Sequence, residues 1–265
     1  MDRHPEGIAT RREGSWTCEP SAVDREGMSL HNTRVLVIGG TSGIGLGVAR
    51  AVADRGATPI VASRRQSSVD RALAELPGGA VGEIADPTDP LALDRLADAV
   101  GDVDHLVYTA GESLELGRLA DLTPEAINGF LQTRFVGALS AVRVFGPRLR
   151  AGGSVTLTSG TAAWTPGFGA LPVSLCGAMN ALTTALAHEL APIRVNAVAP
   201  GLIRTPLWDD MAEADRQALY EQEAQRVPLG RIGEVDDVVR AYLYCMEQTF
   251  STGTVITVEG GILLV

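Results

Sequence analysis

The sequence contains no lysine, and all 22 of its basic residues are arginine. A lysine amine therefore cannot reach a functional site of this protein, either from the same chain or from another copy of it. Basic charge is scarce as well, because the formal net charge is −10. Since nucleic-acid binding needs a basic face, this charge predicts that nucleic acid is not a partner.

Cysteine and long apolar runs are also in short supply. Cys18, Cys176 and Cys245 are too few and too scattered for a disulfide framework or a zinc site. No uninterrupted apolar run of about 18 residues occurs, which predicts that no segment spans a membrane. Together these shortages favour a reducing, cytoplasmic location.

The first 32 residues differ from the rest of the chain. They mix Arg, Glu, Gly and Pro and lack the apolar stretch of a signal peptide. We expect residues 1–32 to form a disordered N-terminal extension. The chain as a whole is 45% apolar and 20% charged, which is typical of a globular protein.

From residue 33 onward, short β-branched runs alternate with longer amphipathic stretches. Strands are predicted at 34–38, 58–63, 80–84, 105–109, 154–158, 194–199 and 254–258. Helices are predicted at 44–55, 69–76, 91–100, 123–150, 174–190 and 235–248, with a helical insertion at 206–225. This alternation predicts an α/β protein with a doubly wound parallel sheet, a Rossmann fold, in a single domain at 33–265.

A glycine-rich turn lies between the first predicted strand and the first predicted helix. It reads Gly39-Gly40-Thr41-Ser42-Gly43-Ile44-Gly45. Small residues let the backbone approach a pyrophosphate, whose charge then lies at the helix N-terminus. This position in a strand–turn–helix unit predicts a dinucleotide site.

The end of the second predicted strand indicates which dinucleotide binds. Arg64 and Arg65 stand there without a carboxylate. An acidic residue at this point would hold the ribose 2′-hydroxyl of NAD, whereas arginine accommodates a 2′-phosphate. The pair therefore predicts NADP(H).

These motifs, in this order, resemble the short-chain dehydrogenase/reductase family over about residues 33–265. The glycine turn is similar to the family's TGxxxGxG signature with Ile38 in place of its Thr, and Tyr108-Thr109-Ala110-Gly111 is similar to its NNAG motif. Segments 194–201, 205–206, 228–231 and 258–261 resemble its later motifs. The resemblance implies an NADP(H) site made of Gly39, Thr41, Ser42, Gly43, Ile44, Gly45, Arg64, Arg65, Asp86, Ala110, Gly111, Pro200, Gly201 and Thr205.

The catalytic tetrad of that family, Asn-Ser-Tyr-Lys, is kept at one position only. Ser159 matches the serine that polarises the substrate carbonyl, whereas Arg134 aligns with the asparagine. Pro172 stands at the tyrosine, which moves the proton, and Cys176 at the lysine, which lowers the tyrosine pKa and holds the ribose. The family's usual proton transfer therefore cannot operate. Loss of a positioned acid/base slows a reaction by about 10²–10⁴, although the hydride belongs to the cofactor.

Three other groups could contribute chemistry. Tyr220, in the insertion, could reach into the site on closure or simply pack within the lid. Arg134 could stabilise an enolate or oxyanion, or turn to solvent or pair with a carboxylate. Cys176, near a helix start, could have a lowered pKa and act as a nucleophile, or be a small buried apolar residue.

Three functions remain open at this point. The first is an atypical NADP(H)-dependent oxidoreductase that acts on a carbonyl or alcohol of a small apolar organic substrate. The second is a non-redox enzyme, such as a cyclase, isomerase or dehydratase, in the same pocket. The third is a catalytically inactive NADP(H)-binding partner protein. The resemblance also implies a homodimer or homotetramer that pairs through the helices at 123–150 and 174–190.

Overall fold

The computed structural model describes residues 29–112 and 118–265. Of the predicted extension at 1–32, residues 1–28 lie outside the described residues. Residues 29–32 are not separate from the fold, because Leu30 is buried and the Asn32 backbone N–H donates to the Gly56 carbonyl at 2.9 Å. The packed domain therefore includes residues before 33.

Seven parallel strands form one sheet in the order β3-β2-β1-β4-β5-β6-β7. The strands are β1 Arg34–Ile38, β2 Thr58–Ser63, β3 Val81–Ile84, β4 Val103–Tyr108, β5 Leu149–Thr158, β6 Arg194–Pro200 and β7 Val255–Val258. The strand order reverses between β1 and β4, and ligands of such sheets bind beyond the carboxyl ends of the strands at this point. The predicted fold class is confirmed.

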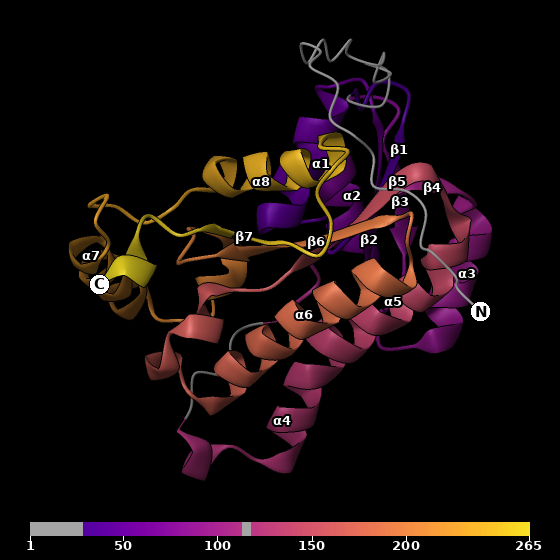
Figure 1. The fold of residues 1–265 in the computed structure, drawn as a ribbon. Coiled ribbons are helices and arrows are strands. Elements are labelled where there is room, and N and C mark those ends of the chain that lie inside the picture. The colour runs from indigo at the N-terminus through magenta and orange to yellow at the C-terminus, as the bar shows by residue number, and fades with distance from the viewer. Residues whose placement is uncertain (1–28, 113–117) are drawn as a thin grey trace, which may run out of the picture.

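Helices cover both faces of the sheet (Figure 1). One face packs against α1 Gly43–Ala53, α2 Gln66–Glu75 and α8 Val235–Glu247, and the other against α3 Pro90–Val100, α5 Gly137–Phe145 and α6 Ala170–Glu189. Strand β1 shows why. Val35 and Val37 pack in the core on the face covered by α1 and α8, and Leu36 and Ile38 pack in the core on the face covered by α3, α5 and α6. Alternate residues of a strand point to opposite faces, so a buried strand must be apolar throughout.

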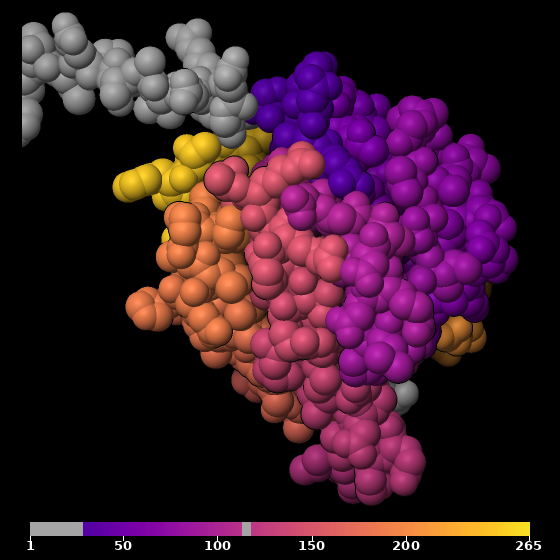
Figure 2. All heavy atoms as spheres, turned by 90° about the vertical axis from the view of Figure 1, so that its right-hand side faces the viewer, coloured from indigo at the N-terminus to yellow at the C-terminus, as the bar shows by residue number. Residues whose placement is uncertain are grey.

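The region predicted as one helix at 123–150 is divided in the structure. It consists of α4 Pro124–Leu131, a π-helical turn at Gln132–Val136, α5, and a 3-10 turn at Gly146–Arg148. Pro147 removes a backbone donor and ends the helix, so β5 already begins at Leu149. The π turn carries Arg134, and α4 projects from the body of the molecule (Figures 1 and 2).

Helix α6 begins at Ala170, four residues before the predicted start. Pro172 is its third residue, and a missing N–H is tolerated there because the first turn has no intrahelical acceptors for it. By length and composition α6 alone among the described helices could cross a membrane. Here it packs on the sheet, with Leu175, Met179 and Leu186 in the core.

A lid follows β6. It contains the 3-10 turn Pro206–Trp208 and α7 Glu213–Arg226, which correspond to the helical insertion predicted at 206–225. Short 3-10 turns complete the described elements at Leu119–Asp121, Thr161–Trp164, Pro166–Phe168 and Ile262–Leu264.

Candidate functional site

The carboxyl ends of four neighbouring strands bring the predicted site residues to one edge of the sheet. Gly39 follows β1, Thr109 follows β4, Ser159 follows β5 and Gly201 follows β6. Backbone hydrogen bonds continue the sheet to this edge, from Thr109 N–H to the Ile38 carbonyl at 2.9 Å and from Ser159 N–H to the Val198 carbonyl at 2.8 Å. Parallel pairing thus gathers motifs that are far apart in the sequence.

The glycine turn is packed too tightly for side chains. A Cβ on Gly39, whose φ is +88°, would lie 2.5 Å from the Ala110 nitrogen, and one on Gly45 would overlap the Gly39 carbonyl. Gly43 has φ +50° and lies against Thr205, which brings the loop after β6 to the start of α1. Close backbone approach is what a bound pyrophosphate requires.

The start of α1 leaves its amide groups available. Ser42, the N-cap, is exposed and makes no side-chain capping hydrogen bond. Thr41 is buried beside it, and Ile44 is half-buried in the first turn. Uncapped N–H groups and the helix dipole favour an anion at this end, so these residues fit a dinucleotide phosphate.

The predicted 2′-phosphate residues differ in their surroundings. Arg64 is half-exposed and its Nη1 lies 2.6 Å from Oε1 of Glu112. Arg65 is exposed and is the N-cap of α2. Asp86, expected near the adenine, accepts hydrogen bonds from Thr88 N–H at 2.9 Å and from its hydroxyl at 2.7 Å.

The loops after β4 and β6 supply the other predicted cofactor residues. Ala110 lies against Gly39, as described above, and Gly111 lies under the guanidinium of Arg134. The Pro200 carbonyl accepts from the Thr161 hydroxyl at 3.3 Å. Gly201 donates its N–H to the Val258 carbonyl at 3.0 Å.

Ser159 is oriented by a residue that the sequence prediction missed. Its Oγ lies 2.6 Å from Oδ1 of Asn180 and 3.2 Å from the Cys176 carbonyl. When Asn180 accepts the serine proton, Ser159 offers only lone pairs to a ligand; an amide turned over would donate to Ser159 and free that proton. Asn180 lies four residues after Cys176 on α6, a spacing that places both on one helix face.

At the two α6 positions expected to hold the family's tyrosine and lysine, no side chain acts as an acid or base near neutral pH. Pro172 is buried and has no ionisable group. Burial raises the pKa of the Cys176 thiol to about 11, although the charge of Arg134 and a hydrogen bond with Ser159 act in the other direction. The lowered pKa expected of a helix start is therefore wrong, and the thiol is protonated at neutral pH.

Arg134 is the cation of this site. Its guanidinium stacks on the Phe130 ring at 4.6 Å from the centroid and donates through Nη2 to the Glu112 carbonyl. Its Nη1 is buried and makes no hydrogen bond to any described residue. Arg134 is thus partly buried, and within residues 29–112 and 118–265 it forms no ion pair with a carboxylate. Burial lowers its pKa, while the charge of Glu112 and, after it, those of Cys176 and Tyr108 act in the other direction, so Arg134 lies within electrostatic range of the thiol.

Tyr220 is not brought to Ser159 in this structure. It is buried in the lid with Leu202, Trp208 and Ile232. The guanidinium of Arg204 stacks on its ring at 4.5 Å from the centroid. These contacts correspond to the lid-packing alternative.

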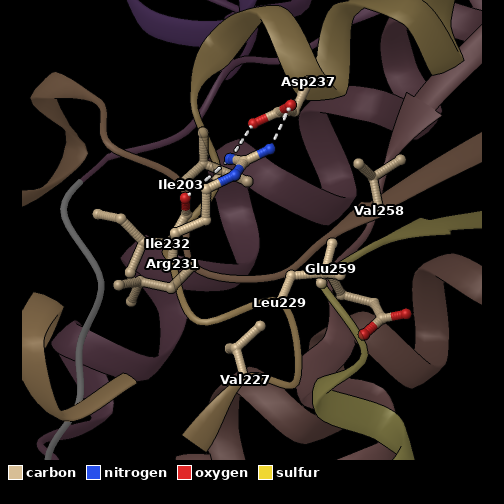
Figure 3. Close-up of a pocket in the computed structure, with 11 residues that line it drawn as sticks. Ile203, Val227, Leu229, Arg231, Ile232, Asp237, Val258 and Glu259 are labelled. Carbon is tan, nitrogen blue, oxygen red and sulfur yellow. Dashed lines mark hydrogen bonds and ion pairs between the residues drawn. The ribbon is translucent and has the colours of Figure 1, made fainter. Parts of the chain in front are cut away.

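A cavity of about 100 Å³ lies below the lid, between the loop after β6 and the C-terminal segment (Figure 3). Its lining is mainly apolar, and its Arg231 and Asp237 are paired with each other at 2.6 Å. Glu259 points away from that pair (Figure 3) and accepts the Gly261 N–H. Neither Ser159 nor Arg134 lines this cavity, so it is separate from the site formed by Ser159, Asn180, Cys176 and Arg134.

Comparison with known proteins agrees with this geometry. Residues 39–263 match the family profile of enoyl-(acyl carrier protein) reductase. The short-chain dehydrogenase/reductase ucsE of an Acremonium species is 33% identical over 255 residues, which cover 89% of this chain and 97% of that protein. The chain belongs to the short-chain dehydrogenase/reductase family. The predicted family is thereby confirmed, and with it an NAD(P)-binding fold of oxidoreductases.

Two solved structures of the family are informative. The MalC reductase/Diels-Alderase of Malbranchea aurantiaca is similar with a TM-score of 0.82 and 30% identity, covering 90% of this chain and 100% of that one. An NADPH-bound short-chain oxidoreductase of Pseudomonas aeruginosa PAO1 with an atypical catalytic center has a TM-score of 0.79 and 27% identity, covering 88% and 98%.

Proposed function

We propose that this protein is an atypical NADP(H)-dependent oxidoreductase that acts on a carbonyl or alcohol of a small apolar organic molecule. The observation that carries the proposal is the contrast between the residues expected to hold the cofactor and those expected to move the proton. The glycine turn, Thr205 and Arg64 keep what a phosphorylated dinucleotide needs, whereas Pro172, Cys176 and Arg134 stand at the altered positions of the catalytic tetrad. NADPH in the Pseudomonas relative supports the choice of cofactor.

Each side chain has a role in this proposal. The α1 amides and Thr205 hold the pyrophosphate, and Arg64 and Arg65 hold the 2′-phosphate. When bound, the nicotinamide supplies or accepts the hydride. Ser159 donates to the substrate oxygen when the Asn180 amide is turned over and frees the serine proton.

The charge and the proton come from different sources. Arg134 is a fixed positive charge near Cys176 and Ser159. A positive charge stabilises an oxygen that becomes negative during the reaction. The proton comes from solvent, either directly or through the Ser159 hydroxyl, which takes up a proton from solvent as it passes its own to the substrate oxygen. Tyr220 serves to pack the lid. We therefore expect slow turnover of substrates whose carbonyl or alcohol oxygen is chemically activated.

A non-redox reaction in the same pocket is the second candidate. It is favoured by the MalC relative, which is both a reductase and a Diels-Alderase, and by the loss of the tyrosine–lysine pair here. Catalysis of that kind needs a shaped pocket, a hydroxyl and a cation, and none of these depends on the missing pair.

The deciding experiment follows the cofactor and the product together. The purified protein is incubated with NADPH and a panel of activated aldehydes, ketones and dienes, and nicotinamide absorbance is recorded beside product mass. Oxidation of one NADPH per product supports the oxidoreductase. Product without NADPH oxidation supports the non-redox enzyme, and tight NADPH binding without any product would indicate a binding protein.

We also propose a homodimer or homotetramer in the cytoplasm. Val136, the last residue of the π turn, and Leu139, in α5, are exposed apolar residues within the 123–150 region through which the family resemblance implies pairing. Light scattering of the purified protein tests the oligomeric state.

A further inference from the structure

Glu112 lies between two arginines that come from distant parts of the chain. Its carboxylate pairs with Arg64, which follows β2, and its carbonyl accepts the hydrogen bond of Arg134 from the π turn. Glu112 itself follows β4, so it stands where the strand order reverses. One residue thus connects Arg64, which is assigned to the 2′-phosphate, with Arg134 in the π turn.

The hydrogen bond from Arg134 fixes the backbone of Glu112. The Arg134 guanidinium is held in turn by the Phe130 ring and lies against Gly111. With its backbone held, the Glu112 side chain loses less freedom when it pairs with Arg64, because part of the ordering has already occurred. The Arg64–Glu112 pair is therefore more favourable than a free surface pair would be.

We propose that Glu112 is a cofactor-specificity residue: it is the counter-ion of Arg64 in the free protein, and an incoming 2′-phosphate must displace it. This inference rests on the proposed NADP(H) assignment. A dinucleotide without the 2′-phosphate leaves the pair intact and meets no such competition. Glu112 therefore weakens the preference for the phosphorylated cofactor.

The size of the effect follows from the exposure of the pair. The side chains of Arg64 and Glu112 are 48% and 43% exposed. Pairs of this kind contribute about 0.2–1 kcal/mol. Removing the competing charge should therefore tighten binding of a 2′-phosphate by about 1.4- to fivefold.

The test uses two ligands that differ only in that phosphate, adenosine 2′,5′-bisphosphate and adenosine 5′-monophosphate, measured by titration calorimetry. Glu112→Gln should bind the bisphosphate about 1.4- to fivefold more tightly, and its affinity for the monophosphate should be unchanged. The gain should vanish in the Arg64→Gln background. The matched control is Glu75→Gln, because the Arg50–Glu75 pair has similar exposure, 48% and 41%, on α1 and α2, and it should change neither affinity.

The outcomes separate this inference from the cofactor assignment. If Arg64→Gln weakens bisphosphate binding but Glu112→Gln leaves it unchanged or weaker, the role of Glu112 is wrong and the NADP(H) assignment stands. If Arg64→Gln does not weaken bisphosphate binding, Arg64 does not hold the 2′-phosphate and the role of Glu112 is wrong; if Arg65→Gln does not weaken it either, the NADP(H) assignment is overturned as well.

Discussion

Single side chains decide what chemistry the proposed site can perform. The sequence predicts that Pro172 and Cys176 stand in place of the family's phenol and ammonium, and within the described part of the chain Arg134 is the cation whose charge acts on the thiol. Because the chain has no lysine, another copy cannot supply the missing ammonium. In the proposed function, activity at this site depends on Ser159, Asn180 and Arg134.

Restoring the family pair should restore its proton transfer. In the double variant Pro172→Tyr with Cys176→Lys, carbonyl turnover with NADPH should rise by about 10²-fold or more, since a positioned acid contributes about 10²–10⁴. Steady-state rates of both single variants and the double variant measure this. NADPH affinity and thermal melting of each variant verify that it folds. A folded double variant with no gain would argue against an oxidoreductase scaffold.

The Cys176 thiol should be slow to react. Its pKa of about 11 leaves little thiolate at neutral pH, and thiolate is the nucleophile. Alkylation by iodoacetamide, mapped to Cys176 by mass spectrometry, should rise with pH until about 11. Arg134→Met removes the charge that lowers this pKa, so the profile should shift to higher pH. Fast alkylation at pH 7 would contradict the assignment.

At the scale of elements, the turns at the carboxyl ends of the strands build the site. The turn after β1 requires glycine for steric reasons, and the π turn between α4 and α5 leaves the Thr133 carbonyl to accept the Tyr108 hydroxyl at 2.5 Å. Single π turns inside helices are frequent at functional sites. Here the turn is the element that directs Arg134 toward Glu112.

A paired glycine replacement tests the turn after β1. Gly45→Ala should destabilise the protein by several kcal/mol and abolish NADPH binding, because the new Cβ would overlap the Gly39 carbonyl and the Thr109 hydroxyl. Gly177→Ala, in α6 with open space around it, should instead stabilise by about 0.5–1 kcal/mol. Chemical denaturation of both variants measures the difference. Equal effects would mean that the turn is not closely packed.

At the scale of the whole molecule, a buried imidazole couples stability to pH. His105, in β4, is buried, and its Nδ1 lies 2.9 Å from the Ser154 hydroxyl. Burial and, second, the charge of Arg194 lower its pKa from 6.5 to about 4. The unfolded chain thus takes up a proton at a higher pH than the folded protein does.

The free energy of unfolding should therefore be at its full value above pH 6.5 and fall as the pH drops toward 4. Between pH 6.5 and 5 the loss is on the order of 2 kcal/mol. Urea denaturation at a series of pH values measures it, and His105→Asn, which keeps a polar partner for Ser154 but cannot titrate, should flatten the slope in that interval. An unchanged slope would show that His105 is not the group responsible.

The sequence alone determined the fold class and the glycine turn, because these depend on local pattern, and it predicted the loss of the tyrosine–lysine pair from residue identity at fixed spacing. It did not show where α5 ends or where α6 begins, since Pro147 and Pro172 have opposite effects according to their place in a helix. Three contacts were decided only by the tertiary structure. Glu112 lies between Arg64 and Arg134, the Ser159 hydroxyl hydrogen-bonds to Asn180, and Tyr220 packs in the lid. The reason is physical: charges and hydrogen-bonding groups choose partners by distance in space, and the pairing of parallel strands sets that distance independently of separation along the chain.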